Sequence, residues 1–268
     1  MLVEFSEFSQ EEGLYKTIKI IEKNQNVVEF CLSRPEVSNA YNNEMIDELL
    51  NALSRLNERT KVLVISGDGN NFQAGADLEW LRKASNKDAE FNLQLSENSF
   101  EFFDCLRRLS IPVVAKIQGF CGGGGTGIVA SCDMAIASND SVFSISEVRW
   151  GMTPSIIFPA LYSSIGAKNI TRYALTGDKF DATKALEIGL ISDITQPHLL
   201  DKSLEMIIDS IMRCSASAVK LTKKELLKCS NWDILKKTFI KTHAEQRMSI
   251  DAKKGLDAFK RKKEPDWT

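Results

Sequence analysis

The most distinctive stretch of the sequence is Gln118-Gly-Phe-Cys-Gly-Gly-Gly-Gly-Thr-Gly-Ile-Val-Ala-Ser-Cys-Asp133. Its four consecutive glycines, Gly122 to Gly125, follow an apolar run (residues 111–117) that predicts a buried strand, and precede a segment (126–132) compatible with a helix. A helix that begins here carries free N–H groups and a positive dipole end, which favour an anion or an oxygen that becomes negative during a reaction. The alternative is a flexible turn that only lets a helix cross a strand.

Length and composition are those of a globular protein with one large core, or with a core and a smaller helical part. The chain has 268 residues, of which 43% are hydrophobic and 26% charged. Its 34 basic and 36 acidic residues nearly cancel, so bulk charge does not favour nucleic-acid binding. No apolar run approaches membrane-spanning length, and residues 1–13 are acidic without the apolar centre of a signal peptide.

The cysteines and histidines do not predict a metal site. The two histidines, His198 and His243, have no cysteine or histidine partner at ligand spacing, and both are poorly placed for acid–base chemistry. The cysteines form no Cys-x-x-Cys pair and are interpreted as reduced, mostly buried thiols of a cytoplasmic protein. They are Cys31, Cys105, Cys121, Cys132, Cys214 and Cys229.

Strand and helix patterns alternate in the first part of the chain, which predicts an α/β fold with crossover connections. Asn42 or Asn43 can cap a helix whose apolar residues follow at helical spacing. The predicted strands are 17–22 and 26–33 (a hairpin), 61–66, 111–117, 134–137 and 142–145, and a long helical region covers 79–108.

Beyond Pro154 the pattern is mostly helical. The predicted helices are 156–165, 170–175, 182–188, 200–213, 217–229 and 236–261. We therefore expect a flexible extension at 1–13, an α/β core at 14–200 and a helical C-terminal part at 201–268.

Two glycine-containing turns each follow a strand, namely Ala74-Gly75-Ala76 and Gly122 to Gly125. Two backbone N–H groups from these turns, converging on one carbonyl oxygen, would form an oxyanion hole. The alternative is two ordinary turns at strand ends, which spacing alone does not exclude. A dinucleotide loop is disfavoured because the glycines lie far along the chain and no spaced acidic residue for a ribose is evident.

Glu147 is the candidate acid–base group. It lies among apolar residues in Phe143-Ser-Ile-Ser-Glu-Val-Arg-Trp-Gly151, where loss of solvent would raise its pKa toward neutrality. For an isolated glutamate, a surface ion pair with Arg149 is the better interpretation. No Gly-x-Ser-x-Gly motif suggests a nucleophilic serine.

Taken together, the motifs resemble the enoyl-CoA hydratase/isomerase (crotonase) superfamily over nearly the whole chain. They are Leu32-Ser-Arg-Pro-Glu-Val-Ser-Asn-Ala40, Phe72-Gln-Ala-Gly-Ala-Asp-Leu78, the glycine stretch, Phe143 to Gly151, Leu175-Thr-Gly-Asp178, Ala182-x-x-Ala185 and Gly189-Leu190. The resemblance implies a repeated ββα core with a helical C-terminal part, assembled as trimers or pairs of trimers. It also implies an acyl-CoA thioester as ligand, with coenzyme A as part of the substrate and no separate cofactor.

The resemblance also implies roles for individual residues. The N–H groups of Ala76 and Gly124 would hold the thioester oxygen and stabilise an enolate, and Glu147 would move the proton. The residues expected along the substrate and its CoA part are Ala40, Ala74, Gly75, Asp77, Leu78, Gly123, Gly127, Phe259 and Lys262.

One departure from the family pattern concerns the second carboxylate. Typical hydratases carry two glutamates, whereas this chain has Glu147 and, at the other position, Gly127. A single glutamate is typical of family isomerases. However, Ala-Gly-Ala-Asp-Leu-x-Trp with Phe-Ser-Ile-Ser-Glu-Val-Arg resembles bacterial methylglutaconyl-CoA hydratases of leucine breakdown. A distal carboxylate of the substrate could orient water in the space beside Gly127, and Arg149 could receive that carboxylate or form a structural ion pair.

Several functions therefore stay open at the level of sequence. Hydration of a branched glutaconyl-type thioester is the leading interpretation, and isomerisation by Glu147 alone is the second. Decarboxylation of a glutaconyl-type thioester would share the same enolate. A non-catalytic acyl-CoA-binding protein would keep the fold without turnover.

Overall fold

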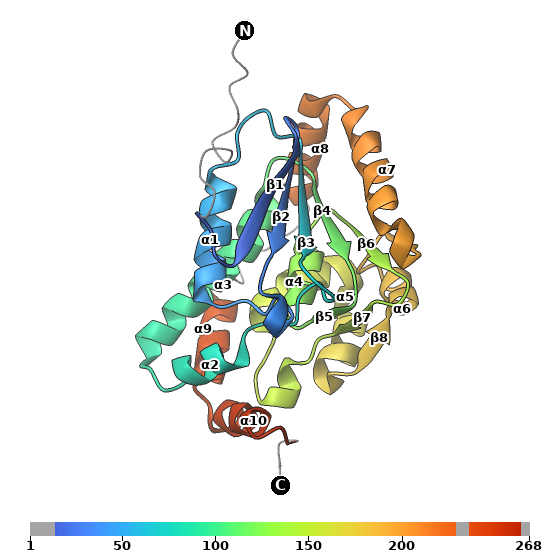
Figure 1. The fold of residues 1–268 in the computed structure, drawn as a ribbon. Coiled ribbons are helices and arrows are strands. Elements are labelled where there is room, and N and C mark those ends of the chain that lie inside the picture. Colours follow the sequence, from blue (N-terminus) through green and yellow to red (C-terminus); the bar gives the residue numbers. More distant parts are fainter. Residues whose placement is uncertain (1–13, 229–235, 264–268) are drawn as a thin grey trace.

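The structure is a computed structural model that describes residues 14–228 and 236–263. A six-stranded sheet of order β1-β2-β3-β4-β6-β9 forms its centre, beside a three-stranded sheet of order β5-β7-β8 (Figure 1). The first two strands pair antiparallel, as the predicted hairpin requires, and the remaining neighbours in the large sheet are parallel. The strands are β1 (Ile18–Asn24), β2 (Val27–Leu32), β3 (Val62–Gly67), β4 (Val113–Ile117), β5 (Phe120–Gly122), β6 (Met134–Ser138), β7 (Val142–Ser144), β8 (Lys179–Asp181) and β9 (Asp193–Thr195).

Helices follow the strands along the chain, which confirms the α/β class. The Asn42 side chain caps the first helix by accepting a hydrogen bond from the Met45 N–H. The α-helices are α1 (Asn43–Ser54), α2 (Leu78–Ala84), α3 (Ala89–Arg108), α4 (Gly124–Ser131), α5 (Phe158–Thr176), α6 (Ala182–Glu187), α7 (Leu200–Met212), α8 (Ala216–Lys228), α9 (Lys236–Arg247) and α10 (Ile250–Lys260). Single 3₁₀ turns are η1 (Pro35–Val37), η2 (Glu147–Trp150), η3 (Ser155–Ile157) and η4 (Pro197–Leu199).

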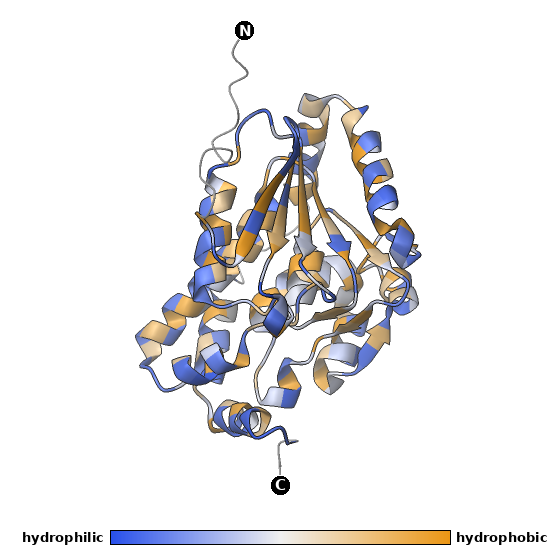
Figure 2. Ribbon diagram, viewed as in Figure 1, coloured by the Kyte–Doolittle hydropathy of each residue, from blue (hydrophilic) through white to orange (hydrophobic). Residues whose placement is uncertain are grey.

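Both faces of the large sheet are covered by helices. On β3, Leu63 and Ile65 belong to the main core, which also contains buried side chains of α1 and α3. The alternate residues Val62 and Val64 pack instead with apolar side chains of α7. Because β3 is buried on both sides, it is apolar without alternation, and the central strands of the sheet are coloured mainly as hydrophobic in Figure 2.

Two of the predicted helical regions are each divided into two helices in the structure. The region 79–108 is two helices, because Asp88 caps a new helix by accepting from the Phe91 N–H. The region 236–261 is likewise two helices, and Ser249 caps the second. The two helices predicted at 156–165 and 170–175 correspond to the two segments of α5, which are separated at Gly166, where the backbone leaves the helical conformation with a φ of +70°.

Strands β5, β8 and β9, of three residues each, were not predicted, whereas β7, of the same length, was predicted because it lies in the apolar stretch 142–145. Each of these unpredicted strands completes a sheet edge through backbone hydrogen bonds. The predicted extension at residues 1–13 lies outside the described residues, and the division at residue 200 stays a prediction.

The last two helices, α9 and α10, lie at the end of the molecule that carries the glycine turns. Helix α9 packs on α3, and α10 packs on α2 and η2 (Figure 1). The fit of α10 is close, since a Cβ at Gly255 would lie 2.3 Å from the Trp150 carbonyl oxygen. None of the described helices is long and apolar enough to cross a membrane. The five described cysteines are free, and of these Cys214 is exposed.

Candidate active site

The two glycine turns predicted to form one site lie in contact. A Cβ built on Gly75 would lie 3.2 Å from the Gly122 carbonyl oxygen and 3.6 Å from the Gly124 nitrogen. Gly75 also has a φ of +97°, a conformation that residues with side chains rarely adopt. Glycine is therefore required at position 75 both by backbone conformation and by the close approach of the second turn.

Backbone pairing fixes the direction of the Ala76 N–H group. The Tyr41 N–H donates to the Gly75 carbonyl, and the Asp77 N–H donates to the Tyr41 carbonyl, at 2.9 and 2.8 Å. Since this parallel bridge uses the groups on either side of Ala76, the Ala76 N–H points away from it. In the described part of the chain, neither this N–H nor that of Gly124 donates to a protein acceptor. Both N–H groups are therefore free to donate to a bound ligand.

The Gln73 side chain holds the first turn in shape from within. Its Nε2 donates to the Gly75 carbonyl at 2.8 Å, and its Oε1 accepts from the Gly75 N–H at 2.7 Å. The Gln73 carbonyl in turn accepts from the Gly122 N–H at 2.8 Å, which joins the first turn to β5. Gln73 is fully buried, so this bidentate pairing also satisfies its amide.

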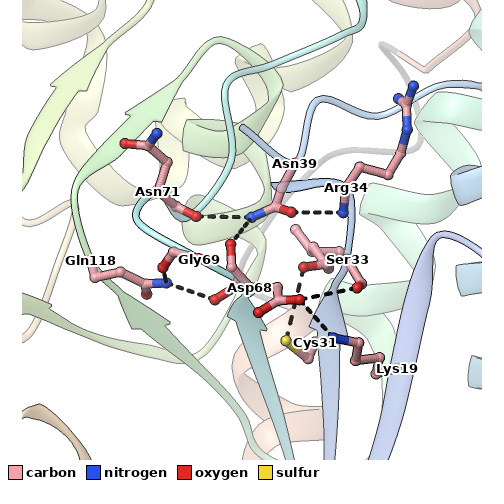
Figure 3. Close-up of polar contacts among 11 residues, drawn as sticks. Lys19, Cys31, Ser33, Arg34, Asn39, Asp68, Gly69, Asn71 and Gln118 are labelled. Atoms are coloured by element: carbon pink, nitrogen blue, oxygen red, sulfur yellow. Dashed lines mark hydrogen bonds and ion pairs between the residues drawn. The ribbon is translucent and has the colours of Figure 1, made fainter. Parts of the chain in front are cut away.

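The loop between β2 and α1 supports the same turn through a buried asparagine, Asn39. Its Nδ2 donates to the carbonyls of Asp68 and Asn71, each at 2.9 Å, and its Oδ1 accepts from the Arg34 N–H at 2.9 Å (Figure 3). The Arg34 guanidinium continues the network by pairing with Asp77 at 2.9 Å. The Arg-Pro…Asn-Ala and Ala-Gly-Ala-Asp motifs are thus joined by direct contacts.

Glu147 begins the 3₁₀ turn η2, three residues after β7. The Ser144 carbonyl at the end of β7 accepts from the Gly123 N–H at 2.8 Å, which brings Glu147 beside the second glycine turn. A Cβ on Gly123 would lie 3.2 Å from the Glu147 Oε1 atom. The residue is partly exposed as a whole, but its Oε2 is inaccessible and has no hydrogen-bond partner among the described residues.

Burial of this carboxyl group raises the pKa of Glu147 to about 7. The group can therefore accept and release a proton near neutral pH. The alternative of an ion pair with Arg149 is wrong, because the Arg149 guanidinium pairs with Asp178 at 3.4 Å.

A cavity of about 60 Å³ connects the two turns and the carboxylate. That volume holds about four or five water-sized groups, which is suitable for a short acyl chain. Its lining residues include Tyr41, Ala74, Gly75, Ala76, Leu78, Gly123, Gly124, Ser146, Glu147, Ile157 and His243. Seven of the residues predicted for the site therefore share one cavity.

Three other predicted residues have different positions. Ala40 and Asp77 do not line this cavity, but Arg34 binds the Ala40 carbonyl and the Asp77 carboxylate and so holds the loops behind it. Gly127 does not line it either. A Cβ on Gly127 would lie 2.3 Å from Ile157 Cγ2, so the predicted space beside Gly127 is filled.

A second cavity, of about 630 Å³, lies beside the first, because Leu78 and Trp150 line both. Phe259 and Lys262, predicted to contact CoA, line this second cavity together with Lys260 and Lys263. The Phe259 ring meets that of Trp150 edge to face, with centroids 5.2 Å apart.

Sequence reasoning missed Tyr41 and His243, and considered His243 poorly placed. The usable signal was the spacing of His243 and Arg247, which predicts neighbouring side chains on one helix face. In the structure, the two are 3.1 Å apart, between His243 Nδ1 and Arg247 Nη2. Across residues 14–228 and 236–263, no group of three His, Cys, Asp or Glu side chains could hold a metal ion.

Comparisons with known proteins identify a family. The sequence model of the enoyl-CoA hydratase/isomerase family matches residues 22–268. The chain is 28% identical to a crotonyl-CoA hydratase of Syntrophomonas wolfei over 92% of this chain and 96% of the relative. It is also 28% identical to a trans-2-decenoyl-[acyl-carrier-protein] isomerase of Streptococcus mutans, over 90% and 94%.

The solved structures agree with the sequence relatives. An enoyl-CoA hydratase from Shewanella pealeana superposes with a TM-score of 0.80 at 29% identity, covering 98% of this chain and all of that one (100%). The expected fold, a crotonase-like core with a helical C-terminal part, is confirmed by this match. The chain is an enzyme that belongs to the enoyl-CoA hydratase/isomerase family.

Proposed function

We propose that the enzyme adds water across the α,β double bond of a short enoyl-CoA thioester, with a branched glutaconyl-type acyl group such as methylglutaconyl-CoA. The observation that carries the proposal is the position of Glu147. Its Oε2 atom has no hydrogen-bond partner among the described residues, its pKa is raised, and it lies beside both glycine turns. The small size of the cavity supports a short acyl group.

In the proposed reaction, the thioester carbonyl oxygen accepts hydrogen bonds from the Ala76 and Gly124 N–H groups. Glu147, as carboxylate, takes a proton from water while the water oxygen bonds to the β-carbon. The electron pair of the double bond moves onto the carbonyl oxygen as an enolate, which the two N–H groups and the positive end of α4 stabilise. Glu147 then gives its proton to the α-carbon, and the carbonyl forms again.

The CoA part would extend from the first cavity into the second. Lys260, Lys262 and Lys263 would supply positive charge to its phosphates there, and Leu78 and Phe259 would supply apolar contact. Assembly as a homotrimer or a pair of trimers stays a proposal, which light scattering of the purified protein tests directly.

The test uses methylglutaconyl-CoA in deuterated water, with the wild type and Glu147→Gln compared by NMR. Hydrated product with deuterium at the α-carbon, formed by the wild type and not by the variant, supports the proposal. Absence of any hydration by the wild type rejects it.

Isomerisation is the second candidate, and a specific observation favours it. Among the described residues that line the cavity, Glu147 is the one carboxylate, and one carboxylate suffices to carry a proton between the α and γ carbons. In the same NMR experiment, migration of the double bond without hydration identifies an isomerase. Loss of carbon dioxide identifies a decarboxylase, whereas binding without turnover in either protein identifies a non-catalytic acyl-CoA-binding protein.

A further inference from the structure

His243 and Glu147 line the same cavity, the first of the two described above. His243 belongs to α9, near the C-terminal end of the described chain. Its Nδ1 atom lies 3.1 Å from the Arg247 Nη2 atom and 3.0 Å from the Ser96 hydroxyl. The Ser96 hydroxyl also lies 2.9 Å from the Asn92 carbonyl, so its one proton is donated either to that carbonyl or to Nδ1. Three polar side chains from two packed helices therefore meet at one ring nitrogen.

We assign the ring proton of His243 from its contact with Arg247. A guanidinium group only donates hydrogen bonds, so Nδ1 of His243 accepts and is unprotonated. The proton of the neutral ring is then on Nε2. Burial and the Arg247 charge lower the pKa of His243 well below its usual value, so the ring stays neutral at physiological pH. It is a fixed hydrogen-bond donor.

The Arg247 guanidinium behind the histidine is buried and lacks a counter-charge. The residue is 1% exposed, and burial lowers its pKa to about 10, which leaves it charged at neutral pH. Its Nε and Nη1 atoms have no hydrogen-bond partner in the described parts of the chain. The Arg247 Cζ atom also lies 5.6 Å from the centroid of the Trp80 ring, and the Tyr41 phenol is close enough to affect the pKa of Arg247.

A buried cation without an anionic partner is costly, so a protein rarely keeps one without a use for its charge. Tyr41 does not supply the missing anion, because burial raises its pKa far above neutrality. Glu147 lines the same cavity, but burial raises its pKa and the Arg247 charge does not lower it, so Glu147 is not the anionic partner of Arg247. The positive potential at this end of the cavity is therefore not neutralised by the described chain.

We propose that the His243–Arg247 pair selects acyl groups that end in a carboxylate. The Nε2–H of His243 donates to the distal carboxylate, and the Arg247 charge behind the ring provides the electrostatic complement. This inference rests on the proposed function in one respect, that the cavity beside Glu147 holds the acyl group. In this proposal the His243–Arg247 pair, and not Arg149, recognises the carboxylate. The Arg149 guanidinium pairs with Asp178 outside this cavity.

Two saturated thioesters test the pair without any turnover, so the result does not depend on whether the enzyme hydrates or isomerises. Glutaryl-CoA carries a distal carboxylate, and butyryl-CoA is a short acyl thioester without one. By calorimetry, the wild type should bind glutaryl-CoA at least about tenfold more tightly. Equal binding, or tighter binding of butyryl-CoA, overturns the proposal.

Variants assign the preference to these two residues. Arg247→Met and His243→Phe should reduce the affinity ratio to about one, and Arg247→Lys should keep part of it, because a cation remains. Butyryl-CoA binding in each variant confirms that the cavity is intact. Arg149→Met is the matched control and should keep the wild-type ratio. If the ratio falls in that variant instead, or survives in the first two, the proposal is wrong.

Nitrogen NMR of the wild type provides a measurement that needs no variant. The chain has only two histidines, so the His243 signals can be distinguished from those of His198. We expect a neutral ring with its proton on Nε2 that does not titrate between pH 6 and 8, and an Nε2 shift that changes with glutaryl-CoA and not with butyryl-CoA. A ring that protonates in this range, or that responds equally to both thioesters, overturns the assignment.

Discussion

Arg34 and Asp77, 43 residues apart in the chain, form an ion pair at 2.9 Å that joins the loop before α1 to the turn carrying Ala76. Both side chains are 16% exposed, so solvent screens the pair only partly. Asp77 also caps α2, because its Oδ1 accepts hydrogen bonds from the N–H groups of Glu79 and Trp80 at the start of that helix. One carboxylate thus fixes both a helix and the loop opposite it.

Breaking this pair should therefore loosen the turn that holds the Ala76 N–H group. We expect Arg34→Met to lower the free energy of unfolding by about 1–3 kcal/mol, because it leaves a partly buried carboxylate without its cation. It should also lower kcat/KM, since the turn is less well fixed. Urea denaturation and initial rates measure the two effects.

A double-mutant cycle with Asp77→Asn, which keeps an N-cap residue, isolates the pair. The double variant should lose less stability than the two single variants together. Strict additivity would mean that the ion pair does not couple the two loops.

The close packing around Gly127 predicts how a larger residue there changes stability. A Cβ there would lie 2.3 Å from Ile157 Cγ2 and 3.2 Å from Phe103 Cε1, with Ile157 fully buried. Gly127→Ala should therefore destabilise the protein by about 1–3 kcal/mol through overpacking. Combining it with Ile157→Ala should cost less than the sum of the two single changes in thermal denaturation, because the second change removes the Cγ2 atom.

The same packing bears on the missing second carboxylate. Gly127→Glu should not create a hydratase-like pair with Glu147, because Ile157 occupies the space that the new side chain needs. A stable Gly127→Glu variant with increased hydration rate would contradict this account of the site.

The sequence predicts those parts of the structure that local pattern controls. Strand β3 and helix α1 follow directly from apolar spacing and from the Asn42 cap. The break between α2 and α3 does not, because the Asp88 cap competes with a helical pattern that continues through it. Strands β5, β8 and β9 are stabilised by their neighbours and leave no clear pattern in the sequence.

The same distinction applies to the site. The sequence indicated that the two glycine turns could converge, because each follows a predicted strand, and the resemblance to the family added Glu147 to the same site. His243 was not, since it reaches the cavity only through the packing of α9 on α3. The predicted space beside Gly127 was wrong for the related reason that Ile157, from η3, fills it. Contacts between distant segments decide these details.

Removing the proton carrier is the most direct test of the catalytic assignment. Glu147→Gln keeps the size of the side chain and should lower kcat by about 10²- to 10⁴-fold, the usual contribution of a positioned acid–base group. KM should change little, because the N–H groups and the cavity remain. Glu187→Gln, at an exposed glutamate paired with Lys184, is the matched control and should keep the wild-type rate. A variant at position 147 with near-normal kcat would exclude Glu147 as the proton carrier.

The rate should depend on pH through the same group. The proposed reaction starts with Glu147 as carboxylate, and burial raises the pKa of Glu147 to about 7. In the free enzyme, kcat/KM should therefore fall about tenfold per pH unit below that pKa and level off above it. Initial rates from pH 5.5 to 8.5 measure the profile. A profile that is flat down to pH 5.5 would place the ionisation elsewhere.

The raised pKa also predicts how stability changes with pH. Since the folded-state pKa of Glu147, about 7, exceeds its ordinary value of 4.5, the folded protein holds this proton more tightly than the unfolded chain. The associated stability is fully present below pH 4.5 and is lost as the pH rises toward and through 7. Glu147→Gln has no such proton, so its stability should rise relative to the wild type by about 2–3 kcal/mol between pH 5 and 8. Urea denaturation of both proteins at the two pH values measures this difference, in which the contributions of all other groups cancel. A difference that stays constant with pH would show that the carboxyl group is solvated in the folded protein and that its pKa is not raised.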